Sequence, residues 1–149
     1  MAHAFPTGLR VVDVLLVEDD PGDVLITTEL LAESARPNAL HVVGDGHQAM
    51  SFLRRTEGFA GAPRPGLILL DINLPRRNGL EVLAEVKNDP SLLTIPVVML
   101  TTSRAQADIH ASYQLHANAY ITKPADFDLF TDAIRRIDDF FLALAQLPN

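Results

Sequence analysis

The chain has 149 residues, which is enough for one domain with a full hydrophobic core. Its 19 acidic and 12 basic residues give a formal charge of −7, so the chain lacks the basic excess with which proteins bind a nucleic-acid backbone. It has no cysteine, which excludes disulfides, thiolate metal sites and cysteine nucleophiles. The start of the sequence does not resemble a signal peptide, and no apolar run is long enough for a membrane helix. We therefore expect a cytoplasmic protein without a membrane or nucleic-acid partner.

Short apolar runs predict the strands of a buried sheet. Residues 14–17, 67–70 and 97–100 are rich in leucine and β-branched side chains and do not alternate with polar residues. Such runs are typical of parallel strands that are covered on both faces. Residues 40–43 and 119–122 are weaker candidates for two further strands.

Helix-start signals follow the strands. Asp20 stands before a proline and Asn78 stands three residues before a glutamate, which are patterns of helix N-caps. Ser103 is expected to cap a further helix, and Asp126 to cap a last helix that runs to about residue 146. The chain is thus a strand–helix unit repeated five times, and right-handed crossovers make that a doubly wound α/β sandwich.

The residues that follow the strands carry the candidate chemistry, because such folds bind ligands at the carboxyl ends of their strands. Glu18 and Asp19 follow the first strand, Asp71 the third, Thr101 the fourth and Lys123 the fifth. Carboxylates brought close together need a proton or a cation between them, and oxygen ligands suit Mg²⁺. The lysine and the hydroxyl complete a place for a phosphoryl group. Asp71, alone after the most apolar run, is the candidate nucleophile.

Other polar residues are expected to have structural roles only. We interpret Asp20 and Asp23 as helix-cap residues, and Lys87 as an exposed charge at a helix end that the helix dipole favours. The five histidines show no spacing that suggests metal ligands.

These residues lie in motifs that resemble the receiver domain of two-component response regulators, the CheY-like fold. The motifs are residues 15–20 (Leu-Leu-Val-Glu-Asp-Asp), 69–75 (Leu-Leu-Asp-Ile-Asn-Leu-Pro), 99–103 (Met-Leu-Thr-Thr-Ser) and 120–124 (Tyr-Ile-Thr-Lys-Pro). The resemblance covers about residues 11–143 and implies five helices around a five-stranded parallel sheet in the order 2-1-3-4-5. Residues 62–65, 74–79 and 101–103 are most similar to single-domain regulators that serve bacterial and cyanobacterial phytochrome histidine kinases.

The resemblance implies a role for each acid. Asp71 would accept the phosphoryl group from a sensor histidine kinase, most simply a bacteriophytochrome. Mg²⁺ would be held by side-chain oxygens of Asp19 and Asp71 and by the backbone carbonyl of Asn73, with Glu18 acting through water.

The resemblance also implies a switch. Thr101 would hydrogen-bond the phosphoryl group, Lys123 would pair with it, and Tyr120 would swing inward when Thr101 moves. The peptide bond between Lys123 and Pro124 would be cis, as X–Pro bonds allow. His116 departs from the family pattern, because relatives usually have glycine at this helix end.

Three classes of function stay open. The leading interpretation is a signalling switch that is an enzyme only in its own phosphorylation and dephosphorylation. A Mg²⁺-dependent phosphatase with an aspartyl nucleophile is the second, although Asn73 stands where such an enzyme tends to carry a second acid. A phosphorylation-independent interaction module is the third. We expect residues 1–10 to be an extension, 11–146 the receiver and 147–149 a tail, with no output domain, so that the protein relays or drains phosphate or switches a partner.

The last predicted helix carries two apolar rows. One row steps by three and four from Phe127 to Leu144 and is the expected core face. A second row consists of Leu129, Ala133, Phe140 and Leu147. Because the apolar arc is wider than one sheet needs, we hypothesise a homodimer through this helix and its neighbours, with kinase docking as the competing use.

Overall fold

Five parallel strands form a single sheet in the order β2-β1-β3-β4-β5, which confirms the predicted fold class. The structure is a computed structural model that describes residues 10–148, so nearly all of the predicted N-terminal extension and the last residue of the predicted tail lie outside it. The elements in chain order are β1 (Val12–Val17), α1 (Pro21–Ala32), β2 (Asn38–Val43), α2 (Gly46–Arg54), β3 (Leu67–Leu70), α3 (Gly79–Asn88), β4 (Val97–Thr101), α4 (Gln106–Gln114), β5 (Ala119–Thr122), α5 (Phe127–Ile137) and the π-helix η1 (Asp138–Leu144).

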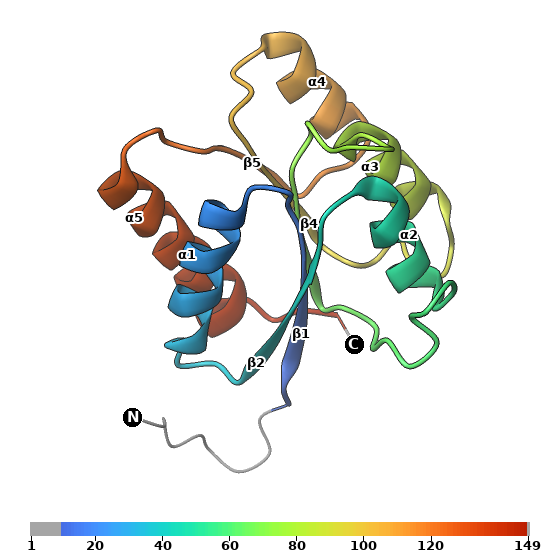
Figure 1. Ribbon diagram of the computed structural model, residues 1–149, viewed down its shortest axis with the longest axis horizontal. Helices are drawn as coiled ribbons and strands as arrows, with labels where there is room; N and C mark the ends of the chain where they lie inside the picture. The colour runs from blue at the N-terminus through green and yellow to red at the C-terminus, as the bar shows by residue number, and fades with distance from the viewer. Residues whose placement is uncertain (1–9, 149) are drawn as a thin grey trace.

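Helices cover both faces of the sheet. In Figure 1, α1 and α5 lie on one side of the strands, and α2 and α3 lie on the other. Leu15 and Val17 of β1 face the α2–α3 side, whereas Val14 and Leu16 face the α1–α5 side, and all four are buried. This alternation between two apolar layers explains why the strand sequences do not alternate with polar residues.

Three of the four predicted helix caps are confirmed. The side chains of Asp20, Asn78 and Asp126 accept hydrogen bonds from backbone N–H groups of the first turns of α1, α3 and α5. The prediction for Ser103 is wrong, because Ala105 occupies the N-cap of α4. The Ser103 hydroxyl instead donates to the carboxylate of Asp108, which lies inside the first turn of that helix.

The C-terminal helix differs from its prediction. The α-helical part ends at Ile137 and continues as a π-helix to Leu144, after which the chain is extended. The prediction that Phe127 lies on the core face is wrong, because this first residue of α5 is 64% exposed, whereas Phe130 in the same turn is buried. Leu147 lies beyond the helix and packs with the core under the α1–α5 layer, so its assignment to the second apolar row is wrong.

Two further residues behave differently from their expected roles. The ammonium of Lys87 donates to the carbonyls of Leu93 (3.0 Å) and Ile95 (2.8 Å), so it closes the loop between α3 and β4 and is not a simple solvated charge. His116 adopts the left-handed backbone conformation (φ 71°), which favours glycine, in the turn after α4. Within residues 10–148, no helix is both long and apolar enough to cross a bilayer.

Candidate functional site

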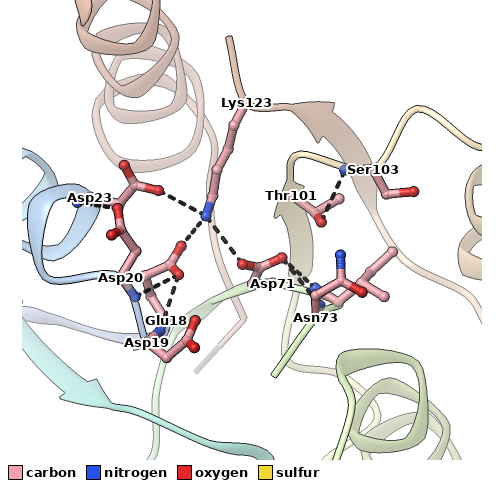
Figure 2. Close-up of polar contacts among 10 residues, drawn as sticks. Glu18, Asp19, Asp20, Asp23, Asp71, Asn73, Thr101, Ser103 and Lys123 are labelled. Atoms are coloured by element: carbon pink, nitrogen blue, oxygen red, sulfur yellow. Dashed lines mark hydrogen bonds and ion pairs between the residues drawn. The ribbon is translucent and has the colours of Figure 1, made fainter. Parts of the chain in front are cut away.

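The strand register brings the candidate residues to one edge of the sheet. Val17 is aligned with Leu70, and Thr101 is aligned with Thr122, so the residues that follow these strands emerge side by side. Figure 2 shows Glu18, Asp71, Thr101 and Lys123 around one space at that edge. The site is therefore a product of the sheet order, as the doubly wound fold predicts.

Three acids form the centre of the site. Glu18, Asp19 and Asp71 each place one carboxylate oxygen within 4.8 Å of the others. Glu18 is 3% and Asp71 is 8% exposed, whereas Asp19 is open to solvent. Backbone groups fix the two buried acids: Glu18 accepts from the N–H groups of Asp19 (3.0 Å) and Asp20 (3.2 Å), and Asp71 Oδ1 accepts from the N–H of Ile72 (2.7 Å).

Lys123 reaches into this cluster from the end of β5. Its Nζ forms ion pairs with Asp71 Oδ2 at 3.2 Å, with Asp23 Oδ2 at 3.0 Å and, closest, with Glu18 Oε1. One ammonium thus faces three carboxylates, and Asp19 adds a fourth beside them (Figure 2). The side chains leave the site with an excess of negative charge.

Asp23 is a member of the site that the sequence analysis missed. Its backbone N–H donates to the Asp20 carboxylate that caps α1, but its own carboxylate forms an ion pair with Lys123. A usable signal existed, because α1 begins directly at the acidic loop and its first turn must border whatever that loop binds.

The excess of acids shows in the pKa values. Burial raises the pKa of Glu18, and the hydrogen bond and charge of Lys123 offset only part of that effect. Burial also raises the pKa of Asp23, again against the pull of Lys123. For Lys123 itself, burial acts to lower the pKa, but the bond to Glu18 and the charge of Asp71 outweigh it and raise the pKa. The lysine is therefore charged, and the carboxylates favour a further cation.

The predicted switch residues are linked through one residue. Thr101 is buried, and its hydroxyl accepts the N–H of Ser103 at 3.4 Å. The hydroxyl of Tyr120 donates to the carbonyl of Ser103 at 2.9 Å, and the Tyr120 ring packs against the core. Burial raises the pKa of this phenol. Ser103 thus connects Thr101 to Tyr120, a contact that the sequence does not reveal.

A glycine supports the loop that holds Asp71. Gly79, the first residue of α3, donates its N–H to the carbonyl of Ile72 at 2.7 Å. A Cβ at this position would lie 1.9 Å from the carbonyl oxygen of Asp71. Asn73 is exposed in the same loop, and its N–H approaches Asp71 Oδ1 at 3.4 Å.

The peptide bond between Lys123 and Pro124 corrects one implication of the resemblance. Every peptide bond of the described chain is trans, including this one. The tertiary amide of an X–Pro bond leaves the two isomers close in free energy, so the motif alone does not decide between them.

The donor set fits a hard divalent cation. The three clustered carboxylates, from Glu18, Asp19 and Asp71, come from the loops that follow β1 and β3, and that of Asp19 is open to solvent. All three offer oxygen ligands. Mg²⁺ is bound by one or two carboxylates with several waters, and an open, acid-rich loop meets that need.

The sequence and the structure were then compared with known proteins. Residues 14–135 match the family model of the response regulator receiver domain. The chain belongs to the response regulator receiver family. It is 44% identical to response regulator Rcp1 of Synechocystis sp. over 135 residues, which cover 91% of this chain and 92% of Rcp1.

Two solved structures of receivers are very similar to this one. The phosphorylated cyanobacterial phytochrome response regulator RcpA superimposes with a TM-score of 0.91 at 46% identity, covering 94% of this chain and 100% of RcpA. The Mn²⁺-bound form of Rcp1 gives a TM-score of 0.91 at 43% identity, covering 93% of this chain and 99% of Rcp1. The predicted resemblance to phytochrome-linked receivers is therefore confirmed.

Proposed function

We propose that residues 11–146 act as a phosphorylation-dependent signalling switch in which Asp71 accepts a phosphoryl group from a histidine kinase. The observation that carries this proposal is the position of the Asp71 carboxylate, which is buried at the strand edge between the Lys123 ammonium and the other acids. Oδ1 of Asp71 accepts the N–H of Ile72 at 2.7 Å, whereas Oδ2 faces the Lys123 ammonium at 3.2 Å and accepts no backbone N–H of the described residues. Oδ2 is thus the oxygen that can attack.

The chemistry is a direct transfer. Asp71 Oδ2 forms a bond to phosphorus, the phosphorus–nitrogen bond of the donor phosphohistidine breaks, and its electron pair returns to the imidazole. Lys123 neutralises charge on the transferred group, and Thr101 donates its hydroxyl to a phosphoryl oxygen. Glu18, Asp19, Asp71 and the Asn73 carbonyl would hold Mg²⁺, which when bound supplies further charge neutralisation on the phosphoryl oxygens.

The switch rests on the contacts of Ser103. A phosphoryl group on Asp71 that draws in the Thr101 hydroxyl moves this group away from the N–H of Ser103, which the hydroxyl accepts at 3.4 Å in this structure. Ser103 also holds the Tyr120 hydroxyl, so a change at Thr101 alters the position of the tyrosine. Phosphorylation then shifts an equilibrium between two arrangements, because the phosphoryl group binds one of them better.

The kinase partner is inferred from the relatives. The 46% identity to RcpA, a phytochrome response regulator, supports a bacteriophytochrome as the phosphoryl donor. A receiver of such a kinase would act in the cytoplasm. Incubation with radiolabelled autophosphorylated phytochrome kinase should transfer the label to this protein within minutes and faster than to an unrelated receiver. Transfer at the same slow rate to both receivers would exclude this partner.

Self-phosphorylation from a small donor tests the main claim. With Mg²⁺ and acetyl phosphate, intact-mass measurement should show the gain of one phosphoryl group, and Asp71→Asn should abolish it. Asp20→Asn is a matched control, because it changes a neighbouring acid in the same loop and an asparagine still caps α1. An undiminished adduct on Asp71→Asn would refute the assignment. Rapid turnover of many phosphate esters would favour the phosphatase instead.

We further propose that the protein forms a homodimer through its C-terminal helix. Leu129 and Phe140 are 59% and 54% exposed, and Ala133 lies half-buried between them in sequence. Exposed large apolar side chains on one helical segment mark a contact surface. Sedimentation should show Phe140→Glu as a monomer where the parent protein is a dimer. Leu93→Glu, at an exposed leucine outside this helix, should leave the dimer intact, and a monomeric parent at high micromolar concentration would end the proposal.

A further inference from the structure

The end of the sheet opposite the acidic site carries a second hollow surface. One cavity of about 160 Å³ lies at the N-terminal end of β1, and a second of about 330 Å³ lies beside the residues that precede β3. Both cavities are lined by Arg64 and Pro65. The two cavities therefore adjoin. Arginines from four loops and element ends line the pair, and we call this surface the arginine groove: Arg10, Arg36, Arg54, Arg55 and Arg64.

Four of the arginines in this groove have few carboxylate partners: Arg36, Arg54, Arg55 and Arg64. Arg54 pairs with Glu85 at 3.1 Å. Arg36 donates from Nε to the carbonyl of Arg10, and Arg64 donates to the carbonyl of Ser91 and the Thr94 hydroxyl. Within residues 10–148, no carboxylate pairs with Arg36, Arg55 or Arg64. A concentration of positive charge therefore stands in a protein whose formal charge is −7.

The backbone and one hydrogen bond place the Arg55 side chain at the second cavity. Arg55 is the C-cap of α2 and adopts the left-handed conformation (φ 57°), which favours glycine or asparagine. Its Nε donates to the carbonyl of Ala62 and holds the side chain at the second cavity.

The remaining lining narrows the class of occupant. Apolar side chains line part of both cavities, including Val12 and Leu147 in one and Leu92 in the other. The first cavity also includes Asp13, whose carboxylate is already paired with His41 at 2.9 Å. Neither cavity is lined by an aromatic ring on which a base could stack, which disfavours a nucleotide or a single-stranded nucleic acid. Guanidinium groups bind carboxylates in a bidentate manner, and apolar walls accept aliphatic side chains.

We propose that the arginine groove binds a partner-protein segment in which acidic and aliphatic side chains alternate. An extended segment of this kind places carboxylates against the rim and aliphatic side chains against the walls. The groove lies before the strands and Asp71 lies after them, so both surfaces can be occupied at once. This inference does not depend on the function proposed for Asp71.

Fluorescence anisotropy with a labelled Glu-Leu repeat peptide tests the proposal on the full chain. The peptide should bind, the affinity should fall as salt rises, and a Gln-Leu repeat should not bind. The double variant Arg36→Gln with Arg64→Gln should weaken binding at least about tenfold, which is about 1.4 kcal/mol, since two charge-assisted contacts with carboxylates are lost. Arg36→Lys with Arg64→Lys should restore part of the affinity, and equal melting temperatures verify folding.

Matched variants decide the outcome. Arg104→Gln with Arg135→Gln removes two exposed arginines elsewhere and should leave peptide binding unchanged. Equal weakening by both double variants would show nonspecific attraction and overturn the proposal. So would displacement of the peptide by inorganic phosphate or duplex DNA at micromolar concentration, or dissociation of a homo-oligomer by the groove variants, which would make a second copy the occupant. Binding to Asp71→Asn should equal that of the parent, which separates this test from that of phosphorylation.

Discussion

Gly79→Ala is expected to damage the acidic site without changing any acidic residue. A Cβ at Gly79 would stand 1.9 Å from the Asp71 carbonyl oxygen and 2.9 Å from the Cα of Ile72. Contacts of a Cβ essentially never fall below 3.0 Å, so the oxygen contact must lengthen by about 1.1 Å, from 1.9 to at least 3.0 Å. The atoms in the way are backbone, and the only relief is a shift of the loop that carries Asp71.

The magnitude follows from that shift. Overpacking costs about 1–3 kcal/mol, and the upper end applies because no flexible side chain can yield. A loss of about 3 kcal/mol lowers the Tm of a domain of this size by about 6–12 °C. A displacement of about 1 Å at the reacting group slows a positioned reaction about 100-fold.

Two assays measure these effects. Thermal unfolding gives the Tm, and intact mass after incubation with acetyl phosphate and Mg²⁺ gives the rate of phosphorylation. Gly61→Ala is the matched control, since a Cβ there meets nothing within 4 Å. Helix propensity alone favours alanine by about 1 kcal/mol in a helix interior. A Gly79→Ala protein that melts above the parent, or phosphorylates as fast as Gly61→Ala, would therefore refute the reasoning.

Three further outcomes are expected. Asn118→Ala should cost about 1–3 kcal/mol in urea unfolding, because the side chain accepts the N–H of Val97 at 2.8 Å and its loss leaves that donor unpaired; a cost near zero contradicts this. Burial raises the pKa of Asp138, so the folded state favours the protonated carboxyl, and this contribution is lost as pH rises through the raised pKa. The side chain in the variant Asp138→Asn does not titrate and can still accept from Ser34, so the difference in Tm between variant and parent should grow as pH rises from acid to neutral. A difference in Tm that stays constant with pH argues against this reasoning. Mg²⁺ at ten times its Kd should stabilise the parent by about 1.4 kcal/mol, and Asp19→Asn should lose most of that gain in thermal unfolding; an equal gain would remove Asp19 from the metal site.

The sequence predicted the sheet well because its signals are local. Residues 14–17 and 67–70 are apolar without alternation, which only a doubly covered strand requires, and both became central strands. Asp20 and Asn78 cap helices through bonds to residues three positions ahead, so a short window contains the whole interaction.

The errors concern contacts between distant segments. The carboxylate of Asp23 turns to a lysine at the end of the sheet's last strand, and no local pattern encodes that direction. The ammonium of Lys87 donates a hydrogen bond to the carbonyl of Ile95, in the loop that returns from α3 to β4. A helical repeat continued to Leu147 fails, because the helix changes to π-helical geometry and ends at Leu144.

The spread of the site along the chain also sets when the site can exist. Glu18 and Lys123 are 105 positions apart, and the strand that positions the lysine is the last in the sheet. A chain still emerging from the ribosome therefore carries its acids long before it has the cation that organises them. We expect such an unfinished chain to be no acceptor for a kinase, so that kinase molecules are not diverted to receivers that are still being made.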